Sequence, residues 1–264
     1  MLLLLIVIIR VHLLTNEKEL FYAIRACEFL FVSSGFLVGY NYVYKNIPNT
    51  FAYSFKYYYK HLRTCYPLYL LNFIFGVIRN KEKIKFNLST VEIILINIFM
   101  LQVWSRHRKL VAFYNGISWF LHDLLLCYLL SPFLLNGINS IKKSLIIFFV
   151  TSLIRILVEE FLKHGAFNVL DIHLHDGPFV RIFEFYLGML IIPSFLKLRL
   201  LIEKKKKQIE FKILFTSIPI LLTIIIYYIF IYYRNLLRCY FVLIFCIYVF
   251  IIGYEYGYLP DILS

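Results

Sequence analysis

Charged residues are scarce in this chain. Asp, Glu, Lys and Arg make up 16% of its 264 residues, whereas an ordinary soluble domain contains about 25%. Apolar residues account for 61% of the sequence, and the mean hydropathy is +0.77. So few charges cannot cover a folded surface in water. We therefore expect an integral membrane protein and not a soluble globular domain.

Three sequence signatures are also absent. The chain has no Cys-x-x-Cys pair, and its cysteines lie in or beside apolar runs, which predicts small buried side chains and no disulfide framework or zinc site. The N-terminal run Met1–Ile9 has no basic region and no small-residue cleavage site, so we expect it to be a retained span. No internal repeat of the kind that marks many transporters is found.

The formal net charge of +13 would point to nucleic acid in a soluble protein. Here the basic residues are scattered between apolar runs and do not gather on one face. In a membrane protein such Lys and Arg residues set topology and meet anionic lipid head groups. We therefore expect membrane lipid as a partner and no nucleic acid.

About nine apolar segments of helical length lie between charged clusters. They are Met1–Leu14, Ala26–Tyr44, Cys65–Ile78, Val91–Trp104, Ser118–Leu135, Leu145–Leu162, Phe179–Leu196, Ile213–Tyr233 and Leu237–Gly253. The basic, tyrosine-rich stretch Lys56–Arg63 is typical of a helix in the head-group layer. We predict an all-α, polytopic transmembrane bundle, formed as a single domain of residues 1–264.

Ionisable residues inside apolar spans are costly, so each of them is a candidate for function. His12 is either an interfacial or core histidine with a satisfied ring, or a general base, since neutral imidazole can accept a hydroxyl proton near pH 7. Arg181 and Glu184 are one turn apart, which predicts either an ion pair within the helix or a guanidinium that binds a phosphate. Arg63 has the same two interpretations.

Two further patterns have a structural and a functional interpretation. The small residues Ser33, Ser34 and Gly35 favour close packing between helices, although a serine nucleophile is conceivable. The stretch Asp171–Asp176 contains two histidines and two carboxylates, but its spacing matches no standard zinc pattern. A solvated loop is the better interpretation, and we expect no metal.

Four motifs, taken in order, resemble one family. FLFVSSGFLVGY (Phe29–Tyr40) resembles its second-helix signature, and KYYYKHLRTCYPLYLL (Lys56–Leu71) its basic, aromatic segment with Pro and Tyr. ISWFLHDLLLCYLLSPFLL (Ile117–Leu135) resembles its Trp-Phe-Leu helix, and GPFVRIFEFYLGML (Gly177–Leu190) its Arg-x-x-Glu-Phe-x-x-Gly helix. This is the acyltransferase-3 group of polytopic membrane acyltransferases.

The resemblance implies an enzyme of the cytoplasmic membrane of a bacterium. Such an enzyme transfers an acyl group, most often acetyl from acetyl-CoA as co-substrate, to a hydroxyl of a cell-surface polysaccharide or a lipid-linked envelope glycan. It implies His12 as the general base, with Asp123 as a second catalytic residue, next to the place where many members carry a Glu. The residues that it implies for substrate and coenzyme binding are Ser34, Gly35, Arg63, Tyr66, Trp119, Arg181 and Glu184.

The chain also departs from the family pattern. Met1 stands where the family has a basic residue before His12, and Leu124 stands where many members have a Glu. The family's usual C-terminal Ser-Tyr-x-x-Tyr-Leu-x-His helix has no counterpart, so the chain looks shortened at both ends. Two alternatives therefore remain open: a non-catalytic transporter or flippase for a lipid-linked glycan, and a truncated, inactive acyltransferase.

Overall fold

The computed structural model describes most of the chain between residues 17 and 252. The described ranges are 17–44, 48–79, 88–101, 118–138, 140–163, 178–203 and 238–252, with a few separate positions between 217 and 228. All regular secondary structure in these ranges is helical, which confirms the all-α prediction. Over the same ranges, no helix combines the length and the apolar character that a membrane crossing needs.

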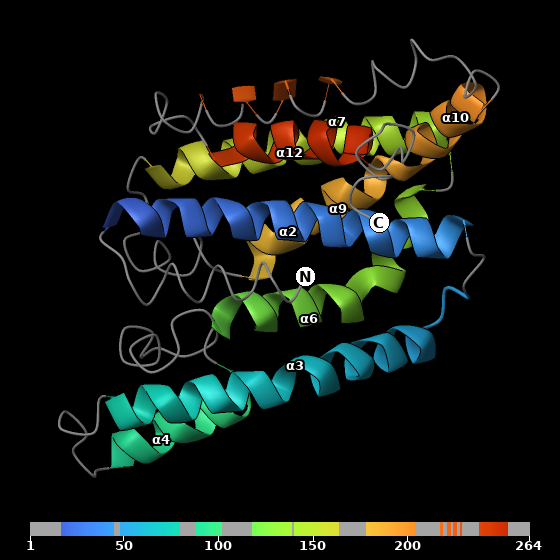
Figure 1. The fold of residues 1–264 in the computed structure, drawn as a ribbon. Helices are drawn as coiled ribbons and strands as arrows, with labels where there is room; N and C mark the ends of the chain where they lie inside the picture. The colour runs from blue at the N-terminus through green and yellow to red at the C-terminus, as the bar shows by residue number, and fades with distance from the viewer. Residues whose placement is uncertain are drawn as a thin grey trace. The chain divides into compact units, whose positions relative to one another are not determined.

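Figure 1 shows the helices in chain order. They are α2 Glu17–Tyr44, α3 Phe51–Arg79, α4 Leu88–Ile98, α6 Ser118–Leu134, the 3-10 helix η3 Leu135–Ile138, α7 Ile141–Lys163, α9 Pro178–Leu190, α10 Ile192–Glu203 and α12 Arg238–Ile252. These helices overlap the second to seventh and the ninth predicted segments. The first predicted segment lies outside the described residues, and only separate positions of the eighth are described.

The separation of Lys56–Arg63 from the third predicted span is wrong. Both belong to α3, which runs without a break from Phe51 to Arg79 and includes Pro67. Proline has no N–H to donate to the carbonyl four residues earlier, here that of Arg63, and usually weakens a helix at that point. α3 nevertheless continues, and Tyr66 and Tyr69, on either side of Pro67, hydrogen-bond to α4.

The seventh predicted span is wrong as a single helix. It is divided at Ile191 into α9 and α10. Pro193 explains the division, because it cannot donate to the carbonyl of Met189 and its ring crowds that turn. Helical bonding resumes at once, since the amide of Phe195 donates to the carbonyl of Ile191 at 3.0 Å.

The chain divides into two compact units, and the single domain predicted from the sequence stays a prediction. The first unit contains Met1–Cys27, Pro48–Phe133 and Phe167–Ile182, and the second contains Glu28–Ile47, Leu134–Ala166 and Phe183–Ser264. Three of the boundaries fall within described helices: inside α2, inside α9 and before the last residue of α6.

In the first unit, α3 packs against α6 with its N-terminal half and against α4 with its C-terminal half (Figure 1). The hydroxyl groups of Ser54 and Ser131 lie 3.3 Å apart between α3 and α6. At the other end, the hydroxyl of Tyr66 donates to the carbonyl of Ile98 at 2.8 Å, and that of Tyr69 donates to the carbonyl of Asn97. The last carbonyls of a helix have no partner within it, so the two tyrosines cap α4.

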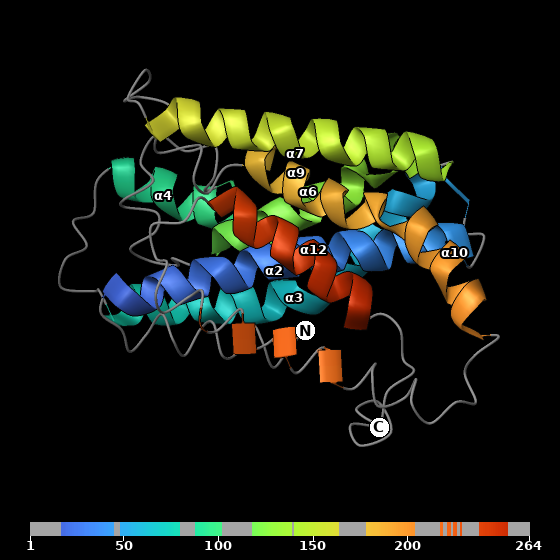
Figure 2. The ribbon, with the colours of Figure 1, turned by 90° about the horizontal axis from the view of Figure 1, so that it is seen from above.

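In the second unit, α7 contacts α10, α12 and η3. Figure 2 shows α7, α10 and α12 from above. The second-unit part of α2 is joined to α10 and α12 by aromatic contacts: Phe36 lies edge-on to Phe195 at 4.9 Å between ring centroids, and Phe29 to Phe245 at 5.5 Å. Such edge-to-face pairs contribute about 0.5–1.5 kcal/mol beyond the burial of their surface.

Candidate functional site

The predicted site residues Trp119 and Arg181 lie together in the first unit. Trp119 belongs to the first turn of α6 and Arg181 to the first turn of α9. The guanidinium carbon of Arg181 lies 5.3 Å from the centroid of the Trp119 ring, which is cation–π distance. Arg181 is fully buried, at 0% exposure. Burial strengthens the attraction because water does not screen it.

Asp123 follows Trp119 by one turn of α6, on the same face of the helix. Its side chain is also 0% exposed, and its Oδ1 lies 3.2 Å from Nδ1 of the neighbouring His122. We call Trp119, Asp123 and Arg181 the interior cluster of the first unit. It combines a buried carboxylate, a buried guanidinium and an indole ring, all of which the sequence singled out.

Glu184 lies in the second unit and has a partner that the sequence did not reveal. Its Oε1 accepts a hydrogen bond from Nη2 of Arg155 on α7 at 3.4 Å, and both side chains are buried. Sequence spacing could not show this pair, because the two residues are 29 positions apart. The predicted pair of Glu184 with Arg181 stays a prediction.

Gly35 and Ser34 lie where α2 meets α9 in the second unit. A Cβ at position 35 would be 1.9 Å from the carbonyl oxygen of Phe185, so only glycine fits there. The hydroxyl of the neighbouring Ser33 donates to the carbonyl of Phe29 at 2.8 Å, within its own helix. Ser34 is buried. This arrangement favours the packing interpretation of these small residues over the nucleophile.

The remaining predicted residues lie on α3 or outside the described part of the chain. Tyr66 is occupied in capping α4, and Arg63 is exposed three residues before it. His12 lies outside the described residues, as does the stretch Asp171–Asp176. Among the residues that the structure describes, no group of three or more His, Cys, Asp or Glu side chains could hold a metal ion.

A cluster of three rings in the first unit was not predicted from the sequence. The imidazole of His61 lies 4.4 Å from the ring centroid of Tyr57 and 4.9 Å from that of Tyr128. Burial, and secondly the charge of Lys60, lower the pKa of His61 below its ordinary value. The i, i+4 spacing of Tyr57 and His61 could have predicted the first contact. Tyr128 comes from α6 and could not have been predicted.

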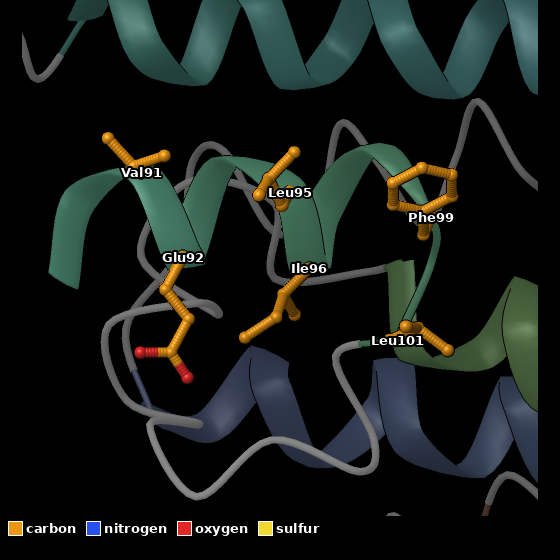
Figure 3. A pocket seen from close by; sticks show the side chains of 6 residues that line it. All are labelled: Val91, Glu92, Leu95, Ile96, Phe99 and Leu101. Atoms are coloured by element: carbon orange, nitrogen blue, oxygen red, sulfur yellow. The ribbon is translucent and has the colours of Figure 1, made fainter. Parts of the chain in front are cut away.

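A shallow hollow of about 360 Å³ lies on the surface of α4 (Figure 3). It is lined by Val91, Glu92, Leu95, Ile96, Phe99 and Leu101. Its lining is apolar except for Glu92, and none of the predicted site residues belongs to it. The hollow therefore offers no group for acid–base chemistry beyond one exposed carboxylate.

Comparison of the chain with protein families, with curated proteins and with solved structures finds no match.

Proposed function

We propose that this chain is a membrane-embedded acyltransferase, which moves an acyl group from acyl-CoA to a hydroxyl of an envelope glycan. The observation that carries the proposal is the position of the motif residues. Trp119 and Arg181, from two of the four motifs that resemble the acyltransferase-3 group, are in contact, with Arg181 fully buried and Trp119 half-buried. Gly35, from a third motif, lies against the backbone of Phe185, which belongs to the same motif as Arg181. Residues far apart in sequence thus meet in the interior.

The proposed membrane location rests on where the charged and apolar side chains lie. Several charged side chains are buried inside the protein, whereas large apolar side chains are exposed on its surface. Glu28, Asp123, Arg181 and Glu184 are 0% exposed, and ionisable side chains of membrane helices almost always face the interior of the bundle. The outer face of α7 carries large apolar side chains with exposures from 42% to 68%: Leu145, Ile146, Phe149, Val150, Leu153, Ile154 and Leu157. A continuous apolar face of this kind is stable against lipid and is unfavourable in water.

In the proposed reaction, His12 accepts the proton of the acceptor hydroxyl while the hydroxyl oxygen attacks the thioester carbonyl carbon. Negative charge then develops on the carbonyl oxygen, where a buried guanidinium stabilises it strongly. We assign this role to Arg181, the guanidinium of the interior cluster. The carbon–sulfur bond breaks, coenzyme A leaves as the thiol with the proton, and the ester remains on the glycan.

Asp123 has a positioning role in this scheme. It lies one turn from Trp119, whose ring covers the guanidinium of Arg181. A buried carboxylate in the same interior partly offsets the cost of burying the guanidinium. The dry surroundings also exclude water, which would hydrolyse the thioester.

The test measures transfer of labelled acetyl from acetyl-CoA to envelope glycan in membranes from cells with and without the gene. Loss of acetyl transfer is expected for His12→Ala, and a drop of about 100-fold for Arg181→Lys, since the oxyanion would lose a positioned donor. Lys143→Gln, at an exposed position of α7, is the control and is expected to keep wild-type activity. Unchanged glycan acetylation without the gene would overturn the proposal. Glycan export that depends on the gene and survives His12→Ala would favour the transporter.

A further inference from the structure

One face of α3 carries three cations followed by a row of apolar side chains. Lys56, Lys60 and Arg63 are separated by four and three residues, and Leu71, Ile74 and Ile78 continue with spacings that fit the same face. At 3.6 residues per turn, all six positions fall within an arc of about 80°. We call this face the α3 ridge.

The cationic half of the α3 ridge is open to its surroundings. Lys56, Lys60 and Arg63 are all exposed. Among the described residues, none of these three side chains forms an ion pair or a hydrogen bond. Phe55 and Tyr59, which flank them, are 53% and 56% exposed. Cations interleaved with aromatic rings are typical of the boundary between a membrane and water.

The apolar half of the ridge is open as well. Leu71, Ile74 and Ile78 are 52%, 55% and 57% exposed. From Arg63 to Ile78 the helix rises by about 22 Å, and the three cations span about 10 Å. One leaflet of a bilayer contributes about 15 Å of hydrocarbon. The stretch from Arg63 to Ile78 therefore matches one leaflet with its head groups, which places the cations beside a polar head group and the apolar side chains beside the acyl chains.

We propose that the α3 ridge binds an anionic glycerophospholipid. Lys56, Lys60 and Arg63 contact the phosphate of the head group, and Leu71, Ile74 and Ile78 contact its acyl chains. The charge is complementary, and the apolar continuation favours a lipid over a soluble phosphate compound such as coenzyme A, which has no hydrocarbon chains. Arg63 thus has a different ligand from the coenzyme that the family resemblance implies. The binding does not depend on acyl transfer, so it can be tested even if the proposed enzyme activity fails.

The experiment uses the purified full-length chain in detergent with equal amounts of phosphatidylglycerol and phosphatidylcholine. Native mass spectrometry counts the bound lipids of each kind. The wild-type protein is expected to retain phosphatidylglycerol in preference. Each basic residue near an anionic lipid contributes a factor of about five, so Lys56→Gln/Lys60→Gln/Arg63→Gln should lower the preference by about 100-fold. Higher salt should weaken it as well.

A matched control removes the same charge elsewhere. Lys142, Lys143 and Lys197 are exposed on α7 and α10, and their combined change to Gln should leave the preference unchanged. An equal loss in this control would overturn the proposal, because net charge alone would then explain the binding. Should the triple variant of the ridge aggregate, Lys60→Gln alone carries the test, with a loss of about fivefold.

The apolar half of the α3 ridge is tested by varying the length of the lipid's acyl chains. Ile74→Ser/Ile78→Ser should reduce the preference for long-chain over dihexanoyl phosphatidylglycerol, while the cation variant loses affinity for both. Coenzyme A is added as a soluble competitor. If coenzyme A displaces phosphatidylglycerol from the wild-type protein and binds with the same dependence on the three cations, the ridge is a coenzyme site and the lipid proposal fails.

Discussion

Gly35 of α2 lies directly against the main-chain carbonyl of Phe185 in α9, so that a Cβ at position 35 would be 1.9 Å from its oxygen. The contact is reciprocal, since a Cβ at Gly188 of α9 would be 2.0 Å from the carbonyl oxygen of Val32. Two backbones can approach this closely only where both helices lack side chains, a device common between membrane helices. The crossing brings α9, which carries Glu184, against α2.

Alanine at either glycine of this crossing should destabilise the protein. Gly35→Ala and Gly188→Ala place a methyl group inside a main-chain contact, so the helices must separate at a cost of about 3 kcal/mol. Gly39→Ala is the control, because its nearest contact would be the side chain of Ile192 at 3.1 Å, and the Cα of Met189 would lie at an ordinary 3.4 Å. Alanine also favours a helix over glycine by up to about 1 kcal/mol, and this gain should offset the crowding. Unfolding in detergent measures all three, and equal losses would contradict this account.

The buried pair of Arg155 and Glu184 should show strong coupling. Arg155→Met or Glu184→Leu alone leaves one buried charge without this partner, which costs about 3–5 kcal/mol of unfolding free energy. The double change to Arg155→Met/Glu184→Leu removes both charges and should recover most of that loss. A double variant whose loss equals the sum of the single losses would show that the two side chains do not interact.

Tyr69 should contribute more to stability than Tyr66, although both cap α4. Tyr69 is 5% exposed, and Tyr69→Phe leaves the carbonyl of Asn97 with one buried hydrogen bond fewer, at a cost of about 1–3 kcal/mol. Tyr66 is less buried, so water can replace its hydroxyl at the carbonyl of Ile98, and Tyr66→Phe should cost about 1 kcal/mol or less. The difference in unfolding free energy between the two variants is the quantity to measure.

His61 should make the fold less stable in mild acid. Its pKa is lowered in the folded protein by burial and by Lys60, so the unfolded chain binds the proton more readily. The stability that neutral His61 provides is complete above its ordinary pKa of about 6.5, and it is lost as the pH falls through that value toward the folded pKa. Unfolding curves between pH 8 and pH 5 measure the effect.

His61→Phe is the matched variant for this pH dependence. Phenylalanine keeps a ring beside Tyr57 and Tyr128 but cannot be protonated. The step in stability near pH 6 should therefore be smaller in His61→Phe than in the wild-type protein. Lys60→Gln should also reduce the step, because it removes one of the two causes of the lowered pKa. A step of the same size in all three proteins would assign it to other groups.

The sequence predicted most helices but not all of their limits. Apolar runs located α2, α6, α7 and α12, because hydropathy and helical length are local properties. The charged stretch Lys56–Arg63 suggested a separate helix, yet it continues into the apolar half of α3. The hydropathy of the seventh predicted segment did not indicate a break at Pro193. The missing N–H of this proline divides the segment into α9 and α10.

The sequence identified the residues of the candidate site but not how they are arranged in space. Trp119, Asp123 and Arg181 were singled out by residue type within apolar runs, and all are in described helices. Their proximity depends on the packing of α9 against α6 in the first unit. Spacing within a helix shows only neighbours three or four residues away.

The amino-acid order alone determined the helical class, the burial of ionisable residues among apolar ones, and the glycine that permits a close crossing. These follow from side-chain chemistry and from short-range periodicity. Only the tertiary structure decided that Glu184 meets Arg155, 29 positions away, and that the guanidinium of Arg181 lies over Trp119. Such contacts depend on how several helices pack at once, and no short stretch of sequence specifies that packing.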